Sequence, residues 1–92
     1  MEDRIYTLKE LLSAPGEGNT PSLHLSVSGV LKFFTYDHLP PSLQAVSKPV
    51  GDLAALMAQS LPSNAELTVG LRKLLEAKDA FVRAGLERGS DE

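Results

Sequence analysis

The sequence predicts a mainly α-helical fold: a helical hairpin with a short N-terminal segment, assembled into an oligomer. Two amphipathic patterns lie on either side of a short break, Leu61-Pro62-Ser63-Asn64, and apolar residues recur in both at spacings of three and four. Those spacings place the apolar side chains on one side of a helix. A connection this short makes the two helices antiparallel neighbours. We therefore divide the chain into an N-terminal segment (1–33), a helical hairpin domain (34–85) and a polar tail (86–92).

The N-terminal segment is expected to begin with a short helix. Thr7-Leu8-Lys9-Glu10 has the spacing of a capping box, in which two side chains bond reciprocally to backbone N–H groups. The apolar residues that would share one side of this helix are Ile5, Leu8, Leu11 and Leu12. The run from Ala14 to Pro21 is rich in proline and glycine and predicts an exposed loop.

The rest of the N-terminal segment favours two short strands. Leu23, Leu25 and Val27 alternate with polar residues, and a period of two indicates a half-buried strand. Gly29 permits a turn, and residues 30–34 then form a second short strand in this interpretation.

The first hairpin helix should begin at Pro41 or Ser42, because the first helical turn does not need the N–H that proline lacks. Pro49 lies inside the pattern, so it either kinks the helix or delays its start. Pro62 ends it. The predicted buried stripe consists of Leu43, Val46, Val50, Leu53, Met57 and either Ser60 or Leu61.

The second hairpin helix has a capping box of its own in Ser63-Asn64-Ala65-Glu66. Gly70 lowers helix stability by about 1 kcal/mol relative to alanine, which a close approach of the first helix would explain. The tail after residue 85 is polar and is expected to fray. The predicted buried side consists of Leu67, Leu71, Leu74, Leu75, Phe81 and Val82.

Self-association is expected because 92 residues bury only a modest core. The chain has no cysteine, which excludes disulfides and cysteine-based zinc sites, and with two histidines we predict no metal or other cofactor. Val69, Leu75 and Val82 lie away from the face that meets the first helix. They contact either the N-terminal segment or a second subunit.

The net charge of −3 argues against DNA or RNA as a partner, because nucleic-acid binding needs clusters of basic residues. A small anion held by a few cations remains compatible with it. No apolar run approaches the roughly 20 residues of a membrane span, and the acidic start Met1-Glu2-Asp3-Arg4 is not that of a signal peptide. We therefore expect a cytoplasmic protein that does not bind membranes.

Catalysis is not predicted. An enzyme needs a positioned nucleophile, base or metal. The sequence has no glycine-rich phosphate loop, no His-Asp metal pair and no Ser-His arrangement in a recognisable context.

The stretch from Phe33 to Pro41 and the run from Glu66 to Ala80 carry a family resemblance. Together with the proline turn between them, they resemble the C-terminal helical hairpin of phage proteins that sequester cyclic nucleotide immune signals, the anti-CBASS and anti-Thoeris sponges. The resemblance spans Phe34 to Arg83. It implies a protein that binds a cyclic oligonucleotide or a cyclic ADP-ribose-type ligand without cleaving it, in the cytoplasm of the infected bacterium. It also implies a homo-oligomer, such as a hexamer, with ligand sites at subunit boundaries.

Phe34 and Tyr36 are the aromatic candidates for stacking on a base, since an extended segment places both on one face. The alternative is that Phe33 and Phe34 simply fill the core. The resemblance implies that Tyr36, just ahead of the hairpin, helps to hold the nucleotide. His38 follows in the same segment and can donate a hydrogen bond to a base or phosphate, or else lies on the surface.

Three cations complete the candidate site. The resemblance implies that Lys48, in the first hairpin helix, contacts a phosphate; the alternative is a solvated lysine. Arg72 and Lys73 lie on the second helix, where Arg72 has the better geometry for bidentate phosphate binding. Two rival functions use the same helices: a structural oligomerisation module, and a helix-turn-helix regulator, which the acidic net charge disfavours.

Overall fold

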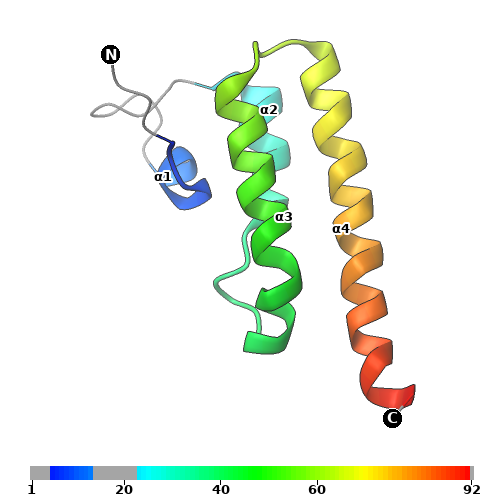
Figure 1. Cartoon of the computed structure of the whole chain (residues 1–92). Helices are drawn as coiled ribbons and strands as arrows, with labels where there is room; N and C mark the ends of the chain where they lie inside the picture. Colours follow the sequence, from blue (N-terminus) through cyan, green and yellow to red (C-terminus); the bar gives the residue numbers. More distant parts are fainter. Residues whose placement is uncertain (1–4, 14–22, 92) are drawn as a thin grey trace.

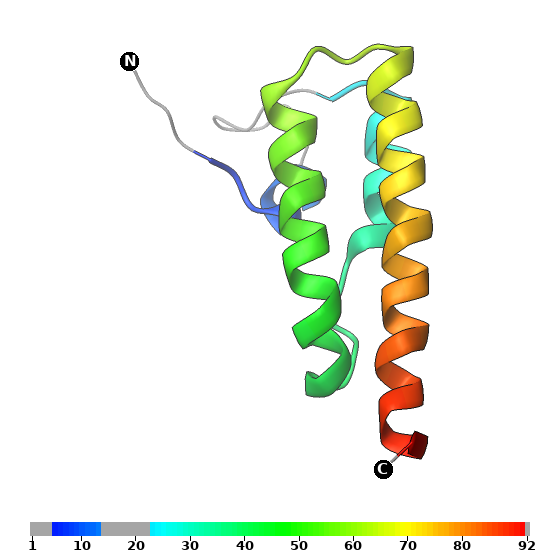
Figure 2. The ribbon, with the colours of Figure 1, turned by 45° about the vertical axis from the view of Figure 1, so that its right-hand side comes forward.

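The computed structural model describes residues 5–13 and 23–91, and in these ranges the chain is helical with no strand (Figure 1). Two long helices lie side by side and antiparallel, with the short helices packed against them (Figure 2). The predicted α-helical class and hairpin are therefore confirmed. The elements are α1 (Leu8–Ser13), α2 (Leu25–Leu31), the 3-10 helix η1 (Lys32–Phe34), α3 (Pro41–Ser60) and α4 (Ala65–Asp91).

α1 begins at the predicted capping box. The Thr7 N–H donates to Glu10 Oε1 at 2.8 Å, and the Glu10 N–H donates to Thr7 Oγ1 at 3.1 Å. The helix is held on α3 by the Gln59 side chain, which accepts from the Tyr6 N–H and donates to the Tyr6 carbonyl, both at 2.7 Å. The predicted loop from Ala14 to Pro21 lies outside the described residues.

The two strands predicted between Leu23 and Phe34 are wrong: α2 and η1 occupy that stretch. The His24 ring caps α2 by accepting from the Ser26 N–H at 3.1 Å. The buried residues of the stretch, Val27, Val30, Leu31 and Phe34, follow helical spacing. Leu25 is 84% exposed, so the alternation of Leu23, Leu25 and Val27 did not mark a buried face.

α3 begins at Pro41, as predicted, and contains Pro49, so that proline does not delay its start. The buried face differs from the predicted stripe, because Leu53 and Leu61 are 43% and 48% exposed. Small side chains allow neighbouring helices to approach closely, which leaves the larger ones at the edge of the contact. The buried residues of α3 are Ser47, Gly51, Ala54, Ala55 and Ala58.

α4 is capped by Asn64 rather than by the predicted Ser63. Asn64 Oδ1 accepts from the Leu67 N–H at 2.9 Å, which moves the helix start one residue along the chain. The helix continues to Asp91, past the predicted boundary at residue 85. Gly70 is not a point of close approach, since nothing lies within 4 Å of a Cβ built there.

The core lies where α1, α2 and η1 cover one side of the hairpin (Figure 2). Leu67 and Leu71 of α4 are buried in it, and Leu74 and Leu75 pack against it, as predicted. Phe81 is 54% exposed, so its predicted burial within the chain is wrong. None of the helices in the described ranges is long and apolar enough to span a membrane.

Candidate functional site

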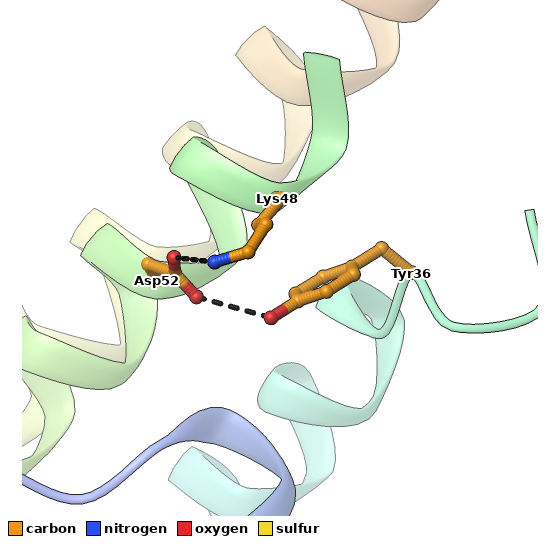
Figure 3. A network of polar contacts seen from close by, with 3 residues as sticks. All are labelled: Tyr36, Lys48 and Asp52. Carbon is orange, nitrogen blue, oxygen red and sulfur yellow. Dashed lines mark hydrogen bonds and ion pairs between the residues drawn. The ribbon is translucent and has the colours of Figure 1, made fainter. Parts of the chain in front are cut away.

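Tyr36, Lys48 and Asp52 form a polar network on the surface of α3 (Figure 3). The Tyr36 hydroxyl donates to Asp52 Oδ1 at 3.2 Å, and Lys48 Nζ lies 2.9 Å from Asp52 Oδ2. The ammonium nitrogen lies 5.8 Å from the centre of the Tyr36 ring, within the range of a cation–π contact. The structure thus brings together two of the residues that the sequence singled out, Tyr36 and Lys48.

The sequence builds this network from two local features. Lys48 and Asp52 stand four residues apart on α3, which makes them neighbours on one helix face. Tyr36 follows the end of η1, where Thr35 has extended backbone geometry that turns the chain towards α3. Its ring lies against Gly51: a Cβ at that position would be 3.2 Å and 3.3 Å from two ring carbons. The Tyr36 ring can pack against α3 at this point because Gly51 has no side chain.

A pocket of about 430 Å³ opens beside Tyr36, between α1 and the segment that follows η1. Ligand pockets for small molecules typically enclose about 300–1,000 Å³. Tyr36 is the aromatic residue of the lining, and Lys9 of α1 is its cation. The complete lining is Thr7, Leu8, Lys9, Leu12, Thr35, Tyr36 and Asp37.

Asp52 and Lys9 were not among the residues that the sequence analysis selected. Asp52 had a local signal, since a carboxylate four residues after a lysine on a helix pairs with it. Lys9 had none. It lies 27 positions before Tyr36, and only the packing of α1 brings the two to one pocket.

Asp52 controls the electrostatics of the network. Its hydrogen bond and charge raise the pKa of Lys48 above the usual 10.5, so the lysine stays fully charged at neutral pH. Burial raises the pKa of Tyr36 above 10.0, and the neighbouring Asp52 carboxylate adds to this. The tyrosine is therefore a neutral hydrogen-bond donor with an intact aromatic face.

Alkaline pH is expected to weaken the folded state through Tyr36. A group whose pKa is higher in the folded state stabilises the fold while protonated and loses that contribution as the pH rises through its folded pKa. The free energy of unfolding should therefore fall above about pH 10, and Tyr36→Phe should make this fall shallower. Urea unfolding of both proteins between pH 8.5 and 11 measures the two slopes. Equal slopes would mean that Tyr36 does not titrate differently in the two states.

The other predicted site residues lie elsewhere. Phe34 is fully buried, so it cannot stack on a ligand while the core is intact, and the exposed aromatic is Phe33 at 65%. The prediction assumed an extended segment, in which Phe34 and Tyr36 share one face. The helical turn of η1 gives the side chains different directions, so that Phe34 points into the core and Phe33 to the surface. His38 lies exposed in the turn before α3.

Arg72 and Lys73 are exposed on α4, outside the pocket at Tyr36. Arg72 lines a separate hollow of about 270 Å³ with Phe33 and Leu75. A third cation of α4, Lys78, has a structural position instead. Its Nζ donates to the Phe33 carbonyl at 2.7 Å and lies 5.9 Å from the centre of the Phe34 ring.

A larger pocket of about 500 Å³ lies between α3 and α4 at the hairpin link. Its walls are almost entirely apolar, and it presents no cation. An anionic ligand would lose its hydration there without a compensating charge.

The arrangement at Tyr36 is suited to binding. The pocket lining includes the aromatic Tyr36, the hydroxyl-bearing Thr7 and Thr35, the cation Lys9 and the carboxylate Asp37. Lys48, paired with Asp52, lies beside the Tyr36 ring but does not line the pocket. Within residues 5–13 and 23–91, no three or more His, Cys, Asp or Glu side chains lie together in a way that could hold a metal ion.

Comparison with known proteins gave no significant match: no family model matches the chain, and no curated protein or solved structure matches it.

Proposed function

We propose that this protein binds a cyclic nucleotide second messenger, a cyclic oligonucleotide or a cyclic ADP-ribose-type molecule, and sequesters it without cleaving it. The observation that carries the proposal is the position of Tyr36. Tyr36 lines the pocket that also contains Lys9, and Lys48 Nζ lies 5.8 Å from the centre of the Tyr36 ring. The resemblance of residues 34–83 to the hairpin of phage sponge proteins supplies the ligand class. In this reading the protein acts in the cytoplasm of an infected bacterium and lowers the concentration of free signal.

One pocket of one chain does not supply the affinity of an effective sponge. Stacking on one aromatic contributes about 1–3 kcal/mol, and two charge-assisted hydrogen bonds add about 1.5–3 kcal/mol each. The sum of about 4–9 kcal/mol falls short of the roughly 12 kcal/mol that nanomolar binding requires. The proposal therefore includes a homo-oligomer, in which a neighbouring subunit adds contacts to the ligand.

Tyr36→Ala and Lys48→Ala should both weaken ligand binding, but they should differ in their effect on the salt dependence of binding. Tyr36→Ala should weaken it by about 1–3 kcal/mol with an unchanged salt dependence, because stacking is not screened. Lys48→Ala should weaken it and flatten its salt dependence, because the variant loses a charge that attracts the anion. Calorimetry at two salt concentrations, with cyclic di- and trinucleotides and a cyclic ADP-ribose as probes, measures both effects. Thermal shifts against the same panel select the ligand first, since a ligand that binds only the folded state raises its stability.

Lys32→Ala is the matched control, since Lys32 is exposed and does not line the pocket. It should bind like the wild type. Chromatography of the ligand after the protein has been denatured should return it intact. Linearised or hydrolysed nucleotide would overturn the proposal of sequestration without turnover.

The second candidate function is a structural oligomerisation module. The observation in its favour is that Asp52 already satisfies both Tyr36 and Lys48 within the chain. If Tyr36→Ala unfolds the protein, and no cyclic nucleotide of the panel binds the wild type, the network is structural and this second function is the correct one.

A further inference from the structure

The pocket beside Tyr36 is lined by two charged side chains that the fold does not use. Lys9 belongs to the α1 side of the pocket, and Asp37 belongs to the segment that follows η1. Within the described ranges, no hydrogen bond or ion pair engages the Lys9 ammonium or the Asp37 carboxylate. Both side chains are exposed. The pocket therefore has one cation and one carboxylate available to a ligand.

The backbone that carries Asp37 is held in place. The Leu39 N–H donates to the Tyr36 carbonyl at 3.0 Å, which closes a turn around Asp37. The Gln44 side chain of α3 donates to the Asp37 carbonyl at 3.4 Å and to the Leu39 carbonyl at 2.7 Å. All three bonds use backbone groups of the turn, and none uses the Asp37 carboxylate. This carboxylate is thus a free acceptor on a fixed turn.

The two hydroxyl groups of the lining give the pocket a direction. Thr7 Oγ1 accepts the capping bond of α1 at 3.1 Å, which leaves its own hydrogen to donate. Thr35 donates to the Lys32 carbonyl at 3.2 Å, which leaves its oxygen to accept. A lysine can only donate, and an ionised aspartate can only accept. Donors therefore come from the α1 side of the pocket, and acceptors come from the segment that follows η1.

We infer that this pocket selects a guanine base, an inference that rests on the proposed binding of a cyclic nucleotide. Guanine is the nucleic-acid base with two adjacent N–H donors on its Watson–Crick edge, at N1 and N2. The two oxygens of the Asp37 carboxylate accept both of them. Adenine has the N1 lone pair beside its N6 amino group, so the carboxylate meets one donor and one acceptor. The adenine of a cyclic ADP-ribose has no pair of adjacent donors either.

The charges of the pocket fix which end of the nucleotide meets which side. A phosphate beside Asp37 would face a like charge, so the base takes that side. The phosphate then lies towards Lys9 and Thr7, the two donors, where a charge-assisted hydrogen bond can form. Tyr36, next to Asp37 in the chain, supplies the stacking surface for the same base.

Calorimetry with cyclic di-GMP and cyclic di-AMP tests the inference. The wild type should bind cyclic di-GMP at least about tenfold more tightly, because a bidentate pair discriminates between bases. Cyclic di-IMP should lie between the two, because hypoxanthine keeps the N1–H but lacks the N2 amino group. Asp37→Asn should reverse the preference, since an amide accepts from the adenine N6 amino group and donates to N1. The variant keeps its fold, because the two side chains have the same shape and the carboxylate makes no bond in the chain.

Asp79→Asn is the matched control for the lost charge. Asp79 is exposed on α4 and lines none of the three pockets described, so the variant should keep the wild-type preference. Two results would overturn the selection of guanine while the proposed function stands. One is a wild type that binds cyclic di-AMP as tightly as cyclic di-GMP, and the other is an Asp37→Asn variant that still prefers cyclic di-GMP. If no cyclic nucleotide binds at all, the proposed function fails, and the inference fails with it.

Discussion

Phe34→Ala is expected to lower the free energy of unfolding by about 3–5 kcal/mol, the usual effect of emptying a buried phenylalanine site. Phe34 is the largest fully buried side chain, and it belongs to a core cluster to which α1, α2, α3 and α4 also contribute residues. A domain of this size has about 5–10 kcal/mol of stability, so the variant should be close to unfolded at room temperature. Urea unfolding followed by circular dichroism measures the loss.

Phe33→Ala is its matched control, because the same side chain is removed one residue earlier from a site that is 65% exposed. The loss there should stay within about 0.5 kcal/mol. The bond from Lys78 to the Phe33 carbonyl is a backbone contact and survives the substitution. Similar losses at residues 33 and 34 would contradict the assignment of Phe34 to the core and of Phe33 to the surface.

Gly51→Ala is expected to destabilise the protein by about 1–2 kcal/mol, although alanine is the better helix former. The gain in helix propensity is about 0.5–1 kcal/mol, and overpacking typically costs about 1–3 kcal/mol. The cost prevails because the added Cβ would lie 2.8 Å from the Phe34 carbonyl oxygen, a backbone atom that cannot turn aside. The Tyr36 ring must also shift by a few tenths of an ångström, because two of its carbons lie 3.2 Å and 3.3 Å from the Cβ position. Thermal unfolding measures the stability, and the tyrosine fluorescence reports on the displaced ring.

Gly29→Ala provides the control for helix propensity. Gly29 is also inside a helix, but nothing lies within 4 Å of its Cβ position. The alanine should therefore stabilise the protein by about 0.5–1 kcal/mol. If both variants are stabilised, the contact between Tyr36 and α3 is looser than the structure shows.

The hairpin was predictable because spacings of three and four, with proline and asparagine at the break, are local signals. The fold of the N-terminal segment was not predictable in this way. The alternation of Leu23, Leu25 and Val27 is identical for a strand and for a short helix with one exposed leucine. What decided between them was the burial of Val27, Val30 and Phe34 against the hairpin, which is a tertiary contact. The buried face of α3 was missed for a related reason, because alanine and glycine carry little weight in a hydrophobic pattern.

The candidate site was predictable in part. Tyr36 and Lys48 were both selected, and the structure brings them together, but it does so through Asp52. The pocket beside Tyr36 has no sequence signal, since Thr7 and Lys9 reach it through the packing of α1. Phe34 was selected on the assumption of an extended backbone, and the single turn of η1 reversed which phenylalanine is buried.

The two hydrogen bonds between Gln59 and Tyr6 join residues 53 positions apart. Bringing such distant groups together carries a chain-entropy cost of about 3.5 kcal/mol, whereas the hairpin closes over a few residues. We therefore expect α1 to dock late in folding and to detach first when the protein opens locally. Since α1 is one wall of the pocket, a ligand bound there would hold the N-terminal segment in place, and slower hydrogen exchange at the Tyr6 amide would report its arrival.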